Sequence, residues 1–196
     1  MLYRLAHLLR EKIGWLWNLI DCFNAMFFSL RYGKCLKDFA FSDIPEGYEI
    51  VSMKNIPAEK LVEFFGSQPK DAFTYFHPHG FDSKSIMRLQ VNKAFLAYVL
   101  IDKSNAKIAG YCFNRCFFHG QGFRGRMVDI DYRGKGLGTA MNKLLNEVGF
   151  GIGLRLFETV SKDNVASYRS ALSASNVRVV KEIPNNELYL EILPNS

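Results

Sequence analysis

The chain has 196 residues, of which 48% are apolar and 22% are charged. This length suffices for a hydrophobic core without disulfides or metals, and the composition excludes a disordered or low-complexity protein. The formal net charge is +6, and residues 1–37 carry +4 of it, from six basic and two acidic side chains. A nucleic-acid-binding protein usually concentrates its basic residues on the folded domain. The uneven charge therefore argues against nucleic acid as a partner and weakly favours an acidic surface.

Residues 1–40 form an N-terminal arm whose apolar positions, from Leu2 to Leu30, recur every three or four residues. This spacing predicts one long amphipathic helix, and Gly33 is its predicted stop. The longest uncharged stretches, Ile13 to Ile20 and Cys22 to Leu30, are too short for a membrane-spanning helix. We expect residues 1–30 to pack on the core or to form a homodimer. The alternative is a basic amphipathic helix in peripheral contact with an anionic membrane.

The four cysteines show neither the spacing of a zinc site nor that of a disulfide framework: Cys22, Cys35, Cys112 and Cys116. They predict reduced, buried thiols and a cytoplasmic protein, with association to a membrane surface left open. No group of potential ligands has metal-binding spacing, so no metal is expected.

Residues 41–196 form the second predicted unit, in which strand and helix patterns alternate irregularly. Strands are expected over Tyr48–Met53, Ala94–Ile101, Ile108–Phe118, a segment ending at Ile130, Leu154–Val160, Val177–Glu182 and Leu188–Ile192. Helices are expected over Ala58–Phe65, from the capping residue Asp82 through Leu89, over Gly136–Val148 and over Asn164–Ser173. This order predicts an α+β fold with a mixed sheet.

The strongest chemical signal is a glycine-rich turn at the boundary between a predicted strand and a predicted helix. It carries three glycines and two basic residues: Arg133, Gly134, Lys135, Gly136 and Gly138. Glycines let a phosphate approach the backbone, and a helix N-terminus offers unpaired N–H groups. The residue order is neither that of a P-loop nor that of a dinucleotide-binding turn. The turn therefore predicts a cradle for a pyrophosphate of another kind.

The segment Arg133-Gly134-Lys135-Gly136-Leu137-Gly138 resembles the Q/R-x-x-G-x-G/A motif of the GNAT superfamily of acetyl-CoA-dependent N-acetyltransferases. After the next predicted strand, Asn164-Val-Ala-Ser167 is similar to the N-x-x-A/S segment of that superfamily. The resemblance covers residues 45–194 and leaves the arm outside. It implies a GNAT-like central mixed, mostly antiparallel sheet flanked by helices, with an N-terminal helical extension.

The same resemblance implies acetyl-CoA as co-substrate and a site for each of its parts. The turn from Gly134 to Thr139 would hold the pyrophosphate, a splayed strand edge would pair with the pantetheine arm, and Asn164 would bind that arm. The implied cofactor-binding residues are Arg126, Met127, Val128, Arg133, Gly134, Lys135, Gly136, Leu137, Gly138, Thr139, Asn164, Ser167 and Tyr168.

The implied reaction is direct attack of a primary amine on the thioester in a ternary complex. The amine must lose a proton, and the developing oxyanion needs a donor, for which the Val128 N–H is the implied candidate. Many members of the superfamily keep a Tyr seven residues after the Asn to protonate the leaving thiolate, but this chain has Ala171 there. Tyr168 lies one turn earlier, and water is the other candidate for this proton.

Candidate bases and acceptor-binding residues come from an aromatic loop and from one strand. His79 and Glu158 are the predicted catalytic residues, and Tyr75 and His77 are the predicted substrate-binding residues. Structural packing is the competing interpretation of both histidines. The loop resembles faintly that of acetyltransferases linked to surface-polysaccharide assembly.

Together, these features predict an N-acetyltransferase for a small-molecule amine acceptor, with an amino sugar or sugar nucleotide of surface-polysaccharide synthesis as the suggested class. Two alternatives remain open. One is a protein or peptide N-acetyltransferase, and the other is a non-catalytic, membrane-associated module that binds acyl-CoA.

Overall fold

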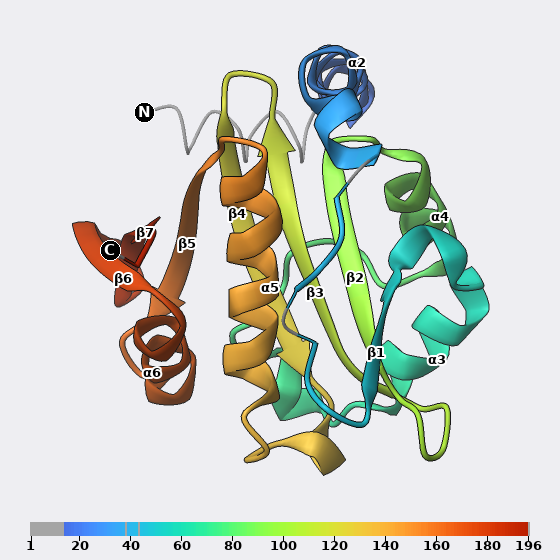
Figure 1. Ribbon diagram of the computed structural model, residues 1–196, viewed down its shortest axis with the longest axis vertical. Helices are drawn as coiled ribbons and strands as arrows, with labels where there is room; N and C mark the ends of the chain where they lie inside the picture. Colours follow the sequence, from blue (N-terminus) through green and yellow to red (C-terminus); the bar gives the residue numbers. More distant parts are fainter. Residues whose placement is uncertain (1–13, 38, 43, 196) are drawn as a thin grey trace.

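A computed structural model of the chain describes residues 14–37, 39–42 and 44–195 (Figure 1). The described residues form one seven-stranded sheet in the order β1-β2-β3-β4-β5-β7-β6. Neighbouring strands are antiparallel except β4 and β5, which are parallel. The strands are β1 Tyr48–Ser52, β2 Phe95–Asp102, β3 Ile108–Phe117, β4 Gln121–Val128, β5 Arg155–Ser161, β6 Asn176–Ile183 and β7 Glu187–Leu193. The predicted mixed, mostly antiparallel sheet flanked by helices is confirmed.

Helices cover both faces of the sheet. The α-helices are α2 Gly14–Lys37, α3 Ala58–Ser67, α4 Ser83–Val91, α5 Leu137–Gly151 and α6 Val165–Ala174. Short 3-10 helices span Met53–Asn55, Lys70–Phe73 and Ile130–Tyr132. Side chains of α3 and α4 share one apolar cluster with β2 and β3, whereas α5 packs on the opposite face. Asp82 caps α4 as predicted, since its carboxylate accepts a hydrogen bond from the Ser85 N–H.

The N-terminal helix α2 lies across one end of the sheet (Figure 1). Its Phe28 is fully buried in a cluster that also contains Leu156 of β5 and Leu190 of β7. The side-chain amide of Asn24 donates to the Cys116 carbonyl and accepts from the Phe118 N–H, at 2.9 and 3.0 Å. Helix α2 therefore shares a core with the sheet, while the domain boundary at residue 40 remains a prediction. None of the described helices combines the length and apolar character needed to cross a membrane.

Three local predictions are wrong, and one lies outside the described residues. Helix α2 continues through Gly33 to Lys37, because Tyr32 is buried and holds the last turns against the core. The strand predicted to end at Ile130 ends at Val128, and Ile130 begins a 3-10 helix. Cys112 and Cys116 are buried thiols as predicted, but Cys22 and Cys35 are exposed. The helix predicted before residue 14 lies outside the described part of the chain.

Candidate functional site

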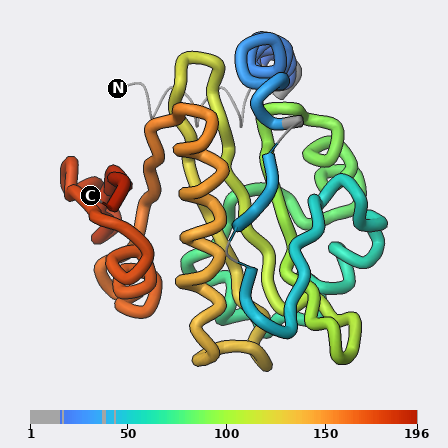
Figure 2. Tube along the Cα trace, viewed as in Figure 1, coloured from blue at the N-terminus to red at the C-terminus, as the bar shows by residue number. Residues whose placement is uncertain are grey.

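The parallel strands β4 and β5 pair over a short stretch and then separate (Figure 2). Their register runs from Gln121↔Arg155 to Phe123↔Phe157. Beyond this point β4 continues to Val128 paired with β3 alone, and β5 continues to Ser161 paired with β7 alone. The Asp129 N–H donates to the carbonyl of Ala109, which belongs to β3. Since successive strand residues point their N–H groups to opposite sides, the Val128 N–H faces the unpaired edge.

The glycine-rich turn joins the end of β4 to the start of α5. Gly134 and Gly136 have φ angles of 76° and 77°, and a Cβ atom added at either would meet no other atom within 4 Å. The first helical bonds run from the Thr139 and Ala140 N–H groups to the Gly136 carbonyl. The backbone N–H groups just before Thr139 lie ahead of these first helical bonds, so they are available to bind an anion.

Basic side chains and a shallow pocket border this turn. The Lys135 Nζ lies 4.5 Å from the ring centroid of Tyr132, whose hydroxyl donates to Asp102 at 2.9 Å. Arg133 is exposed. A surface pocket of about 450 Å³ is lined by Gly136, Thr139, Ala140, Lys143 and Pro45. The turn thus combines positive charge, open space above two glycines and a helix N-terminus.

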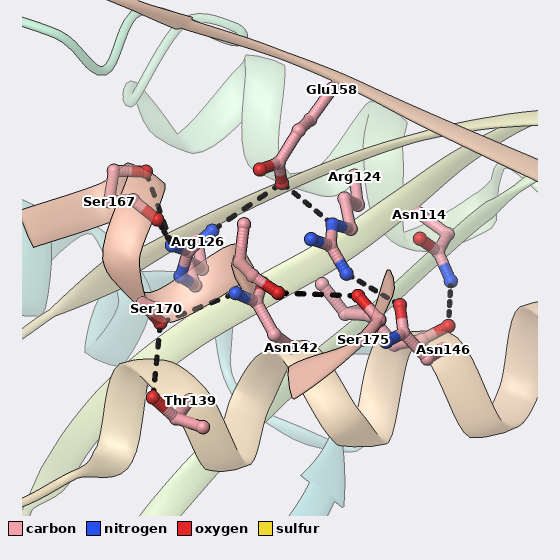
Figure 3. A network of polar contacts seen from close by, with 12 residues as sticks. Asn114, Arg124, Arg126, Thr139, Asn142, Asn146, Glu158, Ser167, Ser170 and Ser175 are labelled. Carbon is pink, nitrogen blue, oxygen red and sulfur yellow. Dashed lines mark hydrogen bonds and ion pairs between the residues drawn. The ribbon is translucent and has the colours of Figure 1, made fainter. Parts of the chain in front are cut away.

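A buried polar network lies where β4 and β5 begin to separate (Figure 3). The Arg124 Nε donates to Glu158 Oε2 at 2.6 Å, and the Arg126 Nη1 lies 3.6 Å from the same oxygen. Arg124 also donates to the side-chain carbonyl of Asn146 on α5. The Arg126 Nη2 donates to the Ser167 carbonyl and hydroxyl oxygens, at 2.9 and 3.1 Å. The network therefore ties β4 to β5, α5 and α6 across the point of separation.

Helix α6 packs closely against α5 beside this network. Asn164 caps α6, because its side-chain oxygen accepts from the Ser167 N–H at 3.2 Å. The Ser170 hydroxyl accepts from the Asn142 side-chain amide at 3.3 Å. A Cβ atom at Gly138 would lie 3.3 Å from the Ser170 Oγ. Gly138 thus permits the close approach of α6.

Several buried atoms of the network have no hydrogen-bond partner among the described residues. They are Arg124 Nη2 and Glu158 Oε1, together with Oδ1 of Asn142 and Oδ1 of Asn114, whose side-chain amide donates to the Leu145 carbonyl of α5. Burial lowers the pKa of Arg126 to about 10, and the neighbouring Glu158 opposes that shift, so the guanidinium stays charged at neutral pH. Buried polar atoms in native proteins nearly always find a partner in protein, water or ligand. The unpaired atoms therefore mark a place where polar groups from outside the chain are needed.

His79 lies on the other face of the sheet, inside an aromatic cluster. Its ring lies within about 6 Å of five aromatic rings: Phe65, Phe81, Phe95, Tyr111 and Phe113. Its Nδ1 contacts the Gly80 carbonyl at 2.8 Å and therefore carries the proton, so its Nε2 accepts from the Tyr111 hydroxyl at 3.0 Å. Burial lowers the pKa of His79 to about 4. The imidazole is neutral at physiological pH, and both of its nitrogens are engaged.

The predicted site residues thus fall into four places. The turn residues and the edge from Arg126 to Val128 lie together with Ser167 and Glu158, although the Met127 side chain is buried in the aromatic face. Tyr168 is half-buried on α6 and packs against the cluster that contains Phe28. Tyr75 and His77 are exposed on the loop before α4. The two predicted catalytic residues, His79 and Glu158, lie on opposite faces of the sheet.

The sequence interpretation missed most of the buried polar network around Glu158. The missed residues lie inward on β4, α5 and α6: Arg124, which donates to Glu158 and to Asn146, and the hydrogen-bonded pair of Asn142 and Ser170. One signal was present, because Asn142 and Asn146 are four residues apart on an otherwise apolar helix face. Among the described residues, no group of three or more His, Cys, Asp or Glu is placed to hold a metal ion.

Solved structures of known proteins share this architecture. The GNAT domain of S. lividans PAT matches with a TM-score of 0.64 and 14% identity, over 74% of this chain and 89% of that domain. The ribosomal-protein-S5-alanine acetyltransferase from Vibrio fischeri matches with a TM-score of 0.62 and 16% identity, over 80% and 97%. The microcin C7 self immunity acetyltransferase MccE, in complex with acetyl-CoA and AMP, matches with a TM-score of 0.57 and 21% identity, over 76% and 94%.

No family model matches the chain, and no curated protein matches it in sequence. The three structural matches cover between 89% and 97% of the known structures and between 74% and 80% of this chain. The chain has the fold of the GNAT acetyltransferases.

Proposed function

We propose that the chain is an N-acetyltransferase that moves an acetyl group from acetyl-CoA to a primary amine. The observation that carries the proposal is the position of the glycine turn, which opens α5 directly beside the unpaired edges of β4 and β5. MccE, which shares the fold, is described in complex with acetyl-CoA. The same combination of turn and edge supports acetyl-CoA as the donor here.

The residues present fit the two halves of this co-substrate. The open space above Gly134 and Gly136, with Lys135 beside them, suits a pyrophosphate. In the network, Glu158 Oε1 is an unpaired acceptor and Arg124 Nη2 is an unpaired donor. An amide N–H and an amide carbonyl are the complement of this pair, and amides are the polar groups of a pantetheine arm.

Acetyl-CoA supplies an activated acetyl thioester when bound. The chain's own contribution begins with the Val128 N–H, which faces the unpaired edge and is therefore free to donate to a developing oxyanion. Arg124 and Arg126, fixed by Glu158, hold that edge at a set distance from α6. This arrangement positions the reacting groups without a covalent intermediate on the enzyme.

Water is the proposed acceptor of the amine proton. His79 uses both ring nitrogens in contacts with Gly80 and Tyr111, and Glu158 is held by two arginines. Both contact patterns weaken a general base, because a proton acceptor needs an available lone pair and little opposing positive charge. The assignment of either residue as the base is an untested prediction.

A small acceptor is the proposed substrate class, and an amino sugar is the proposed example. Tyr75 is 52% exposed and His77 is also exposed, both on the loop that precedes α4. An exposed aromatic ring can stack on a sugar ring, and an exposed imidazole can form a hydrogen bond with it. No specific contact favours a peptide acceptor over this class.

A thiol-release assay with amino sugars, polyamines and peptides tests the activity, and calorimetry with acetyl-CoA tests the donor site. Gly136→Glu should abolish binding of acetyl-CoA, because it places a carboxylate where the pyrophosphate is expected. Gly153→Glu is the matched control: Gly153 has a φ of 80° and equally open surroundings, at the other end of α5. Unchanged affinity in Gly136→Glu would remove the assignment of the turn.

A further inference from the structure

Helix α2 exposes a continuous apolar face to solvent. Six large apolar side chains on the described part of the helix are between 45% and 77% exposed: Leu19, Ile20, Phe23, Met26, Phe27 and Leu30. Their spacing of three, four and seven residues places them along one side, opposite the side that buries Asn24 and Phe28. Phe118, at the tip of the β3–β4 hairpin, is 47% exposed, and its ring centroid lies 5.8 Å from that of Phe27 in a tilted arrangement. The outward face of α2 and this tip form one surface.

The charges around this surface are positive. Asp21 is the single acidic residue of α2, and it lies on the inner side, where it pairs with Arg115 and accepts from Asn92. Arg31 and Lys34 follow the apolar residues at the C-terminal end of the helix, and both are exposed. The outward face of α2 therefore carries apolar and basic side chains without an acidic one. This composition complements an anionic lipid surface.

A cavity of about 670 Å³ begins at the same end of α2. Three lysines line it, Lys34 from α2, Lys54 from the 3-10 helix after β1, and Lys93 from the segment before β2. None of the described lining residues is acidic, and they include Phe41 and Tyr98, whose rings contact each other edge to face. Burial and the charge of Lys93 lower the pKa of Lys54.

This surface lies at the end of the sheet away from the glycine turn (Figure 1). Strand β4 runs from the hairpin tip at Phe118 to the turn, so the two features stand at opposite ends of one strand. A molecule that rested on its α2 end would keep the N-terminus of α5 directed away from the support. Water-soluble molecules could then reach the turn.

We propose that the outward face of α2 and the hairpin tip dock the protein on an anionic membrane surface, with the lysine-lined cavity receiving a lipid phosphate. The apolar side chains would enter the boundary between headgroups and acyl chains, while Lys34 contributes to both the face and the cavity. The proposal is independent of acetyl transfer, because it uses no residue of the glycine turn or of the network. A second copy of the chain is the competing occupant of the same face.

Flotation of the full chain with vesicles of phosphatidylglycerol and phosphatidylcholine tests the apolar face. Wild-type protein should float with mixed vesicles, and Leu30→Glu should weaken this binding by about tenfold or more. Val91→Glu is the matched control, since Val91 on α4 is also 77% exposed. Failure of the wild type to float, or equal losses in both variants, would overturn the proposal.

Two further experiments test the role of the lysines and the alternative of a dimer. Replacing Lys54 and Lys93 by Gln should reduce binding to the anionic vesicles by about tenfold, whereas the same replacement of Lys60 and Lys107, both exposed elsewhere, should have a much smaller effect. Equal effects would remove the cavity from the proposal. Sedimentation of the wild type and of Leu30→Glu tests whether a second copy covers the face. If the wild type is a dimer and the substitution dissociates it, the face belongs to a dimer interface.

Discussion

The two faces of the sheet around β4 are built differently. On the face covered by α3 and α4, His79 is enclosed by aromatic rings, and both of its nitrogens are paired. On the face covered by α5 and α6, Arg124, Arg126 and Glu158 are buried together, and two of their atoms find no partner in the described part of the chain. The first arrangement completes a core. The second leaves polar atoms that water or a ligand must satisfy, at the position where the strands separate.

The largest expected effect comes from breaking the polar face. Glu158→Leu would leave two buried guanidinium groups without their shared carboxylate, and removing one partner of a buried ion pair costs about 3–5 kcal/mol of unfolding free energy. Urea unfolding measures this loss. Glu182→Leu is the control, because Glu182 pairs with Lys162 on the surface and should cost less than about 1 kcal/mol. A similar small loss for Glu158→Leu would show that the two arginines are satisfied by water.

On the aromatic face, burial of His79 should make the free energy of unfolding depend on pH. Because the folded pKa of His79 is about 4 and the unfolded value is near 6.5, the unfolded chain takes up the proton first as the pH falls. Stability from this residue is therefore complete above about pH 6.5 and is lost progressively toward pH 4, by about 3 kcal/mol.

Urea midpoints measured from pH 7.5 to pH 4 test this expectation. His79→Phe should flatten the acid slope, whereas His77→Phe should leave it intact, because His77 is exposed on the same loop. An unchanged slope in His79→Phe would mean that protonated His79 is tolerated in the cluster, and the contrast between the two faces would weaken.

The glycine turn and the start of a helix at Asn164 were predicted from the sequence because each is local, whereas the capping role of the Asn164 side chain was not predicted. The residues of the turn are adjacent in sequence, and Asn164 is only three positions from the N–H that it caps. The network was not predictable in the same way. Arg124 and Glu158 are 34 positions apart and meet because the β4–β5 pairing ends one residue earlier on each strand.

The second limit of the sequence-based prediction was that it could not decide to which face of the sheet each strand residue points. Alternation shows that Glu158 and Thr159 point to opposite faces, but it does not say which face holds α5. Pairing across the sheet decides this, and it places Glu158 with Arg124 and away from His79. For the same reason, a helix stop at Gly33 was predicted from a local preference that the packing of Tyr32 overrides.

The smallest expected effect concerns the proton on the leaving thiolate, at the border of the polar face. Ala171 is fully buried and offers no proton, and Tyr168 packs against the apolar cluster that contains Phe28. A phenol engaged in packing is poorly placed to act as a general acid, and a thiolate leaves tolerably at neutral pH, so water suffices. Tyr168→Phe keeps the packing and should lower kcat by less than tenfold, which is about 1.4 kcal/mol of barrier. Steady-state kinetics with calorimetry of acetyl-CoA binding measure this, and Tyr189→Phe, on β7, is the control. A hundredfold loss in kcat at unchanged cofactor affinity would show that the Tyr168 hydroxyl delivers the proton, and the polar face would then include this side of α6.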